Sequence, residues 1–187
     1  QPKMIVDNIL TYDFDNNELA EKILIEALKD DDREDFNIIS ALSFLGSAKA
    51  VEPLMRILKD KTMPSDVRAS AAIFMGNVED SRTAEPLLKA LKDDDKHVRT
   101  SAIIALGKLR EKRAVEPLIA LLPDGDETTK KHIIDALRLI RPTQILIKSL
   151  HDKREAISLA AIEVLGSIKG EDVVKSVKKL VVTKTGS

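Results

Sequence analysis

The sequence contains no cysteine and no tryptophan, and aromatic residues make up only 3% of it. Without cysteine, the chain can form neither a disulfide framework nor a thiolate metal site. Binding of single-stranded nucleic acid needs aromatic platforms beside a dense basic cleft. The few phenylalanines, such as Phe36 and Phe44, flank a core-facing apolar stripe. We therefore expect most of them to be buried and expect no nucleic-acid partner.

An excess of charge of either sign is also missing. The formal net charge is −1, whereas a grip on nucleic acid or on an anionic membrane needs a marked basic excess. No apolar run approaches the roughly 20 residues that a membrane span requires, and no secretory signal opens the chain. These absences predict a cytoplasmic protein without a membrane partner. Because the first residue is Gln1, we expect a segment of a longer protein or a trimmed chain.

Motifs for catalysis and cofactor binding do not occur. The sequence has no phosphate-binding G-x-x-x-x-G-K-[ST], no dinucleotide-binding G-x-G-x-x-G and no nucleophile elbow G-x-S-x-G. The histidines, which are His97, His132 and His151, lie far apart, and none has a second ligand at metal-binding spacing. We therefore predict that the chain is not an enzyme and holds no cofactor and no metal ion.

What the sequence does contain is an internal repeat. A Leu-x-Asp motif recurs at steps of 28 to 33 residues, beginning at Leu28, Leu58, Leu91, Leu122 and Leu150. A second series, expected to close a helix in each unit, recurs at similar steps at Gly46, Gly76, Gly107, Arg138 and Gly166. Internal periods of this size are typical of stacked solenoids, in which each unit packs only on its neighbours.

Within each unit, apolar residues recur at i, i+3, i+4 and i+7, which predicts two amphipathic helices and no strands. Acidic runs such as residues 93–95 suit the N-terminal ends of the second helices through the helix dipole. We predict one all-α domain of stacked antiparallel helix pairs over residues 1–187. Its parts are an N-terminal cap segment, five repeats and a C-terminal capping helix, at residues 1–16, 17–46, 47–76, 80–107, 111–138, 142–166 and 170–182.

The repeats resemble a known family. The strings that begin at Ala50, Ala84 and Ala114 each read Ala-x-Glu-Pro-Leu or Ala-Glu-Pro-Leu and lead into Leu-x-Asp, as in HEAT repeats. Val67-Arg68 and Val98-Arg99 match the family's opening of the second helix. More narrowly, these strings resemble the HEAT-like repeats of the phycobilisome-lyase type. The resemblance implies a right-handed α-solenoid whose second helices line a concave face, and a family made up mostly of scaffolds with a minority of enzymes.

A basic row is expected at the start of three successive second helices, from Arg68, Arg99 and Lys130. One interpretation is that these side chains pair with aspartates of neighbouring repeats and form a ladder between repeats. The other is that they contact a ligand directly and favour an acidic segment. The first interpretation carries more weight, because aspartates lie close by in the sequence at 60, 66, 93 and 124.

Apolar residues occupy positions that the resemblance places on the concave face. Ile73 and Ile104 stand three residues before Gly76 and Gly107, where a solvated scaffold would carry a charge. Extended apolar patches on proteins tend to be contact surfaces. Alternatively, a slight rotation of the helices would make these isoleucines part of the core. The predicted partner-binding residues are Ile39, Arg68, Ala69, Ile73, Arg99, Thr100, Ile104 and Lys131.

Two functions remain open at this point. The first is a non-enzymatic protein–protein interaction scaffold, whose concave groove takes a peptide or helix of a partner protein. The second is an accessory lyase-type subunit that handles a chromophore or a modified side chain. A lyase-type subunit should bind a pigment, whereas a scaffold should not.

Overall fold

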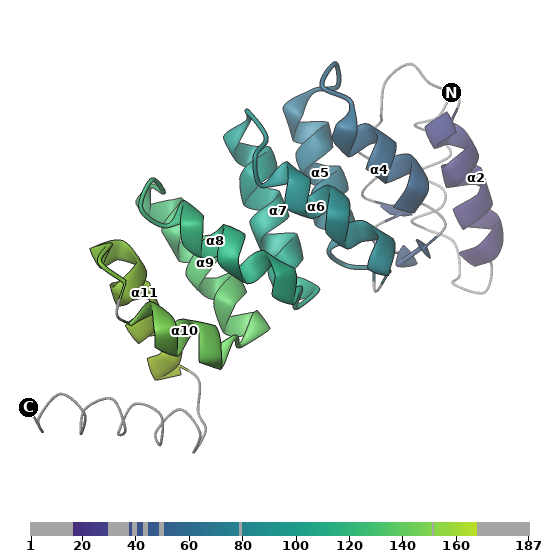
Figure 1. Ribbon diagram of the computed structural model, residues 1–187. Coiled ribbons are helices and arrows are strands. Elements are labelled where there is room, and N and C mark those ends of the chain that lie inside the picture. Colours follow the sequence, from purple (N-terminus) through teal and green to yellow (C-terminus); the bar gives the residue numbers. More distant parts are fainter. Residues whose placement is uncertain are drawn as a thin grey trace, which may run out of the picture. The chain divides into compact units, whose positions relative to one another are not determined.

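The computed structural model describes residues 17–29, 38, 41–42, 45–48, 51–78, 80–150 and 152–167, and these are helical or lie in turns (Figure 1). The expected all-helical architecture is confirmed for this part of the chain, which contains no strand. The predicted cap segment at 1–16 and capping helix at 170–182 lie outside the described residues. So do Ile39 and much of the second half of the predicted first repeat at 17–46.

From α4 onward, the α-helices alternate between the first and the second helix of successive repeats. Their bounds are α2 (Asn17–Lys29), α4 (Val51–Lys59), α5 (Ser65–Met75), η3 (Ser81–Thr83), α6 (Ala84–Ala90), α7 (Lys96–Lys108), η4 (Lys112–Ala114), α8 (Val115–Leu121), α9 (Glu127–Ile140), α10 (Thr143–Ser149) and α11 (Glu155–Ser167).

The chain divides into two compact units, Gln1–Leu109 and Arg110–Ser187. In the first unit, α4 packs on α5, α6 packs on α7, and α5 lies along α7. In the second unit, α8 packs on α9, α10 packs on α11, and α9 lies along α11. In both units, second helices therefore stack on second helices.

The first helices begin with a local signal that the sequence repeats. Pro53 and Pro86 lie in the first turns of α4 and α6, where a missing backbone N–H breaks no hydrogen bond within the helix. Glu52 and Glu85 precede these prolines, and their carboxylates interact favourably with the positive end of the helix dipole. The Glu-Pro pair therefore fixes where each of these helices begins.

Two of the second helices, α7 and α9, begin at aspartates, whereas α5 begins after Pro64 without a side-chain cap. Asp95 precedes α7 and accepts hydrogen bonds from the backbone N–H groups of His97 and Val98, at 2.8 and 3.3 Å. Asp126 precedes α9 and accepts from the backbone N–H of Thr129, at 2.8 Å. Each aspartate satisfies N–H groups that have no partner within the helix.

The C-terminal ends of the second helices differ from the expectation. Among the glycines that the structure describes, only Gly46 has the left-handed backbone expected of a glycine cap, with φ of 60°. Helix α7 continues through Gly107 to Lys108, and α9 continues through Arg138 to Ile140. The chain then turns at two left-handed arginines, Arg110 (φ 51°) and Arg141 (φ 55°). The expected closing residues Gly107 and Arg138 therefore lie just inside their helices, whereas α5 ends directly before Gly76, as expected.

Gly76 has another role, which is close packing between two second helices. Its backbone is right-handed, with φ of −73°, so no turn requires glycine there. A Cβ atom added to Gly76 would lie 2.6 Å from the Cα atom of Ala105 in α7. The absence of a side chain therefore allows α5 and α7 to approach as closely as they do. Buried alanines at equivalent positions on the second helices, such as Ala71 and Ala102, add to this close packing.

We expect Gly76→Ala to destabilise the protein by about 1–3 kcal/mol, because the added methyl group would overlap backbone atoms of α7 and force the helices apart. Chemical denaturation of the variant and the parent would measure this loss. Ser70→Ala is the matched control, since it leaves a Cβ atom at a half-buried position of the same helix. An unchanged free energy of unfolding for Gly76→Ala would show that α5 and α7 can accommodate a methyl group at this contact.

Candidate functional site

The turn between α6 and α7 carries the most buried charge among the described residues. Its three aspartates are Asp93, Asp94 and Asp95, and their environments differ. The side chain of Asp93 is 3% exposed, whereas that of Asp94 is 98% exposed. Asp93 also accepts a hydrogen bond from the backbone N–H of Asp95, at 3.0 Å, which fixes the turn.

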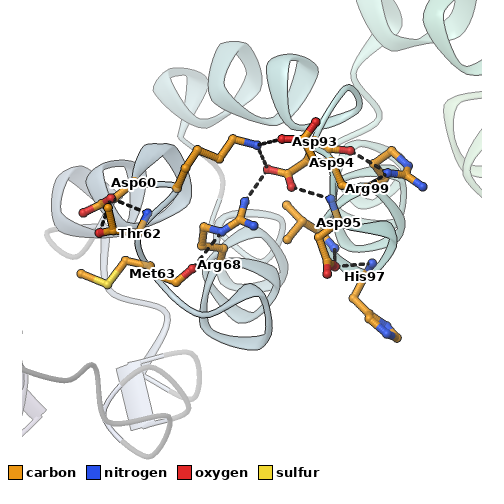
Figure 2. Close-up of polar contacts among 11 residues, drawn as sticks. Asp60, Thr62, Met63, Arg68, Asp93, Asp94, Asp95, His97 and Arg99 are labelled. Atoms are coloured by element: carbon orange, nitrogen blue, oxygen red, sulfur yellow. Dashed lines mark hydrogen bonds and ion pairs between the residues drawn. The ribbon is translucent and has the colours of Figure 1, made fainter.

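Two cations of the preceding repeat reach the buried carboxylate. Arg68, near the start of α5, donates from Nη1 to Oδ2 of Asp93, and the guanidinium is itself buried (Figure 2). Lys61, in the turn before α5, places Nζ 2.7 Å from the same oxygen. Arg68 Nε donates to the carbonyl of Met63, at 3.3 Å. We call Lys61, Arg68 and Asp93 the Asp93 cluster.

A further contact joins the same two repeats. Burial opposes ionisation of the Asp95 carboxyl, which caps α7, but Ser65, the first residue of α5, helps to lower its pKa. The N-terminal ends of α5 and α7 are therefore tied together by side chains from both repeats.

The electrostatics of Asp93 are set by opposing effects. Burial alone would raise the pKa of the Asp93 carboxyl, because it disfavours the charged form. The hydrogen bonds from Lys61, the Asp95 backbone and Arg68 act in the other direction, and the pKa of Asp93 is lowered overall. The same contact with Asp93 raises the pKa of Lys61. The cluster is therefore charged at neutral pH.

The three residues of the basic row make different contacts. Arg68 pairs with Asp93 of the next repeat, as the ladder interpretation predicts. Arg99 donates to the carbonyl oxygens of Asp93 and Asp94 in its own repeat, at 2.6 and 2.9 Å. Nζ of Lys130 lies 3.3 Å from Oε1 of Glu127, which belongs to the same helix. Among these three, only Arg68 therefore forms an ion pair between repeats.

A second feature lies on the half-exposed side of α5 and α7. Asn77 accepts a hydrogen bond from Lys108, at 2.9 Å, which joins the C-terminal ends of the two helices. Ile73 and Ile104 each lie one helical turn before a member of this pair and are both half-buried. The two isoleucines therefore share one surface, neither fully in the core nor fully exposed. Together with Ser70 and Ser101, a further turn back, they form what we call the α5–α7 strip.

The other predicted partner-binding residues lie elsewhere. Ala69 is buried, Thr100 is half-buried beside the strip, and Lys131 is exposed on α9 in the second unit. The positions equivalent to Ile73 and Ile104 on α9 and α11 are acidic. Arg138 bridges them, with contacts of 2.8 Å to both Asp135 and Glu163. The early repeats therefore carry isoleucine at this position, and the late repeats carry an acidic residue.

The sequence reading missed Lys61 of the Asp93 cluster and the pair formed by Asn77 and Lys108. Lys61 directly follows the Asp of a Leu-x-Asp motif, so its position at the end of a repeat was a usable signal. The Asn77–Lys108 pair joins residues 31 apart, which is one repeat, so comparison of equivalent positions could have suggested it.

Two features are absent from the part of the chain that the structure describes. No group of three or more histidine, aspartate or glutamate side chains there is placed to hold a metal ion. No helix in that part is both long and apolar enough to cross a membrane.

Comparison with known proteins identifies the class of protein. Residues 61–138 and 115–187 each match the model of a family described as HEAT repeats, and together these matches span residues 61–187. The chain therefore belongs to the HEAT-repeat family. No curated protein sequence matches it significantly.

Solved structures agree with this assignment at the level of the fold. The complex of CpcE and CpcF of phycocyanin lyase from Nostoc sp. PCC7120 is 20% identical with a TM-score of 0.50, and the match covers 88% of this chain. This chain spans 64% of the length of that one. An engineered protein is 19% identical with a TM-score of 0.50, and the match covers 94% of this chain and 84% of that one. The likeness supports an α-solenoid of repeated helix pairs.

We expect Asp93→Asn to lower the free energy of unfolding by about 3 kcal/mol, because it leaves the buried guanidinium of Arg68 without its counter-charge. Asp94→Asn makes the same chemical change one residue away, at a side chain that is 98% exposed, and should change stability by only about 0.5 kcal/mol. Urea denaturation of both variants would measure the difference. Equal effects of the two substitutions would contradict a structural role for the Asp93 cluster.

The lowered pKa of Asp93 also predicts a pH dependence. Its contribution to stability should be fully present above the ordinary carboxyl pKa of about 4 and lost as pH falls through the lower pKa of the folded state. The stability gap between the parent and Asp93→Asn should therefore shrink as pH falls below about 4. Asp80 and Asp152, whose pKa is held at about 2 by hydrogen bonds from Arg82 and Arg154, affect both proteins equally. A gap that stays constant down to pH 2 would contradict this assignment.

Proposed function

We propose that the protein is a non-enzymatic protein–protein interaction scaffold, and that it binds a peptide or helix of a partner protein on the α5–α7 strip. The observation that carries this proposal is the pair formed by Ile73 and Ile104 on one half-exposed surface. Extended apolar surfaces on proteins tend to be contact sites. The equivalent positions in the second unit are occupied by the charged residues Asp135 and Glu163, so repeat packing itself does not require isoleucine there.

The chemistry of the strip fits a protein partner. Its centre is apolar, and its edges carry the hydroxyl groups of Ser70 and Ser101 on one side and the Asn77–Lys108 pair on the other. An apolar centre with a polar rim is the usual anatomy of an interface, since the rim can satisfy the partner's polar groups. The ammonium group of Lys108 would favour an acidic residue at that edge of the partner.

Not every residue of the predicted set enters the proposed contact. Arg68 binds the Asp93 carboxylate, Arg99 binds backbone carbonyl groups of the same turn, and Ala69 is buried. We therefore propose that these three residues stabilise the α5–α7 strip without contacting the partner. We propose that Thr100 contacts the partner beside Ile73 and Ile104. Lys131 stays a predicted contact on the second unit.

A second candidate function is an accessory lyase-type subunit. It is favoured by the likeness to a structure whose subunits belong to a phycocyanin lyase, although that likeness concerns the fold. Titration with a free bilin would separate the two functions, because a subunit that handles the chromophore should shift its absorbance spectrum. A scaffold of the proposed kind should leave the spectrum unchanged.

The proposed surface can be tested with a displayed library of short random peptides. Peptides enriched on the parent should carry apolar side chains, and their affinity should fall at least about 30-fold in Ile73→Lys/Ile104→Lys, because loss of central anchors costs about 2 kcal/mol or more. Stability should fall by only about 1 kcal/mol, since lysine can extend its charge into water from a half-buried position. Fluorescence anisotropy would measure affinity, and thermal melting would measure stability.

The matched control is Ala120→Lys/Gln144→Lys, which adds the same charge at exposed positions of the first helices α8 and α10. It should leave the affinity of the selected peptides unchanged. A collapse of the melting temperature in Ile73→Lys/Ile104→Lys would place the isoleucines in the core and overturn the proposal. Equal binding by the parent and both variants would overturn it as well.

A further inference from the structure

Charged residues of opposite sign lie one helical turn beyond the two ends of the α5–α7 strip. On α5, Asp66 stands one turn before Ser70, and on α7, Lys108 stands one turn after Ile104. Both charged residues are exposed, whereas Ser70 and Ile104 are half-buried. Lys108 is hydrogen-bonded to Asn77, which lies eleven residues after Asp66 on α5. The two charges are therefore separated by about 16 Å along the helix, at 1.5 Å per residue.

The carboxylate of Asp66 is not used within the first unit. The cations closest to it in the sequence bind a different carboxylate, since Lys61 and Arg68 both contact Asp93. Among the described residues, no cation forms an ion pair with Asp66. The equivalent residue of the next repeat is the exposed His97, so repeat packing does not require a carboxylate at this position. Asp66 therefore offers an exposed negative charge to a ligand.

The other end of the strip offers a positive charge. Lys108 donates one of its three N–H groups to Asn77 and keeps two for a ligand. A partner that covers both ends must therefore place a cation near Asp66 and an anion near Lys108. Opposite charges at the two ends also fix the direction of the partner, because a segment bound the other way round would meet a like charge at each end.

The strip favours a helical partner over an extended one. An extended peptide usually pairs its backbone with the edge of a sheet, and the described part of the chain contains no strand. A proline-rich segment usually binds between aromatic side chains, and the strip has none. A helix instead presents one side at the spacing i, i+4, i+7 and i+11, which is also the spacing of Asp66, Ser70, Ile73 and Asn77 on α5.

We propose that the partner segment is an amphipathic helix that runs antiparallel to α5 and α7, with an acidic first turn against Lys108 and a basic last turn against Asp66. This inference rests on the proposed function, because the same strip supplies the apolar contacts. The charge order also suits the partner helix itself, since carboxylates stabilise the start of a helix and cations its end. Asp66 is then a specificity residue that the predicted partner-binding set does not contain.

The charge order can be tested with peptides selected on the parent from a displayed library, each long enough for about four helical turns. For each enriched peptide, a charge-exchanged version would be synthesised, in which lysine replaces every acidic residue and glutamate replaces every basic one. Fluorescence anisotropy would measure the affinity of both versions for the parent and for Asp66→Lys/Lys108→Glu. Comparing the ratio of the two affinities between the proteins removes any difference in helicity between the peptides.

The parent should bind the original version at least about 10-fold more tightly than the charge-exchanged version, because each end contact changes from attraction to repulsion. Asp66→Lys/Lys108→Glu should reverse this preference. The matched control is Glu116→Lys/Lys148→Glu, which reverses an exposed carboxylate in the first turn of α8 and an exposed lysine in the last turn of α10. The control variant should keep the preference of the parent.

The direction of the partner can be measured separately, because the chain has no native cysteine. A maleimide at the N-terminus of the peptide should label Asn77→Cys faster than His97→Cys, once each rate is divided by the rate with N-ethylmaleimide alone. Equal labelling, or the opposite order, would overturn the antiparallel arrangement.

Failure of this inference and failure of the proposed function give different results. If Asp66→Lys/Lys108→Glu keeps the preference of the parent while Ile73→Lys/Ile104→Lys loses binding, the charge order is wrong and the proposed function stands. If no enriched peptide depends on the two isoleucines, both are overturned.

Discussion

The structure of the first unit depends on the close approach of α5 and α7. Gly76 makes this approach possible, because any Cβ atom there would overlap the backbone of Ala105. Once the two second helices lie this close, the side chains at their ends meet across the interface. Arg68 and Lys61 reach Asp93 near the N-terminal ends, and Lys108 reaches Asn77 at the C-terminal ends. The polar contacts therefore follow from the packing of small residues between the helices.

The buried charge adds specificity to this packing. A buried ion pair contributes little net stability, since the cost of removing two charges from water offsets their attraction, but an unpaired buried charge is costly. Sliding α5 along α7 by one helical turn would separate Arg68 from Asp93 and leave the buried guanidinium without its counter-charge. The Asp93 cluster therefore opposes other registers of the two repeats, while apolar burial supplies most of the stabilisation.

The surfaces offered for binding are those that stacking does not use. On the α5–α7 strip, isoleucines stand at positions where the second unit carries Asp135 and Glu163, so these positions can vary without disturbing the stack. On α11, Leu159 and Ile162 are more than half exposed, whereas the equivalent residues of α5, Ala69 and Ala72, are buried.

The sequence by itself determined the helices, their pairing into repeats and the family, because helical periodicity, Glu-Pro starts and aspartate caps act over a few residues. It also indicated that Arg68 pairs between repeats and that the early repeats carry apolar residues where the late ones are charged. Only the tertiary structure decided that Arg99 binds carbonyl groups of its own turn, that Gly76 is needed for packing, and that Arg110 and Arg141 make the left-handed turns. These outcomes depend on distances between residues about one repeat apart or on how a turn is held by its surroundings. The stacking of helices sets both, and no local pattern records them.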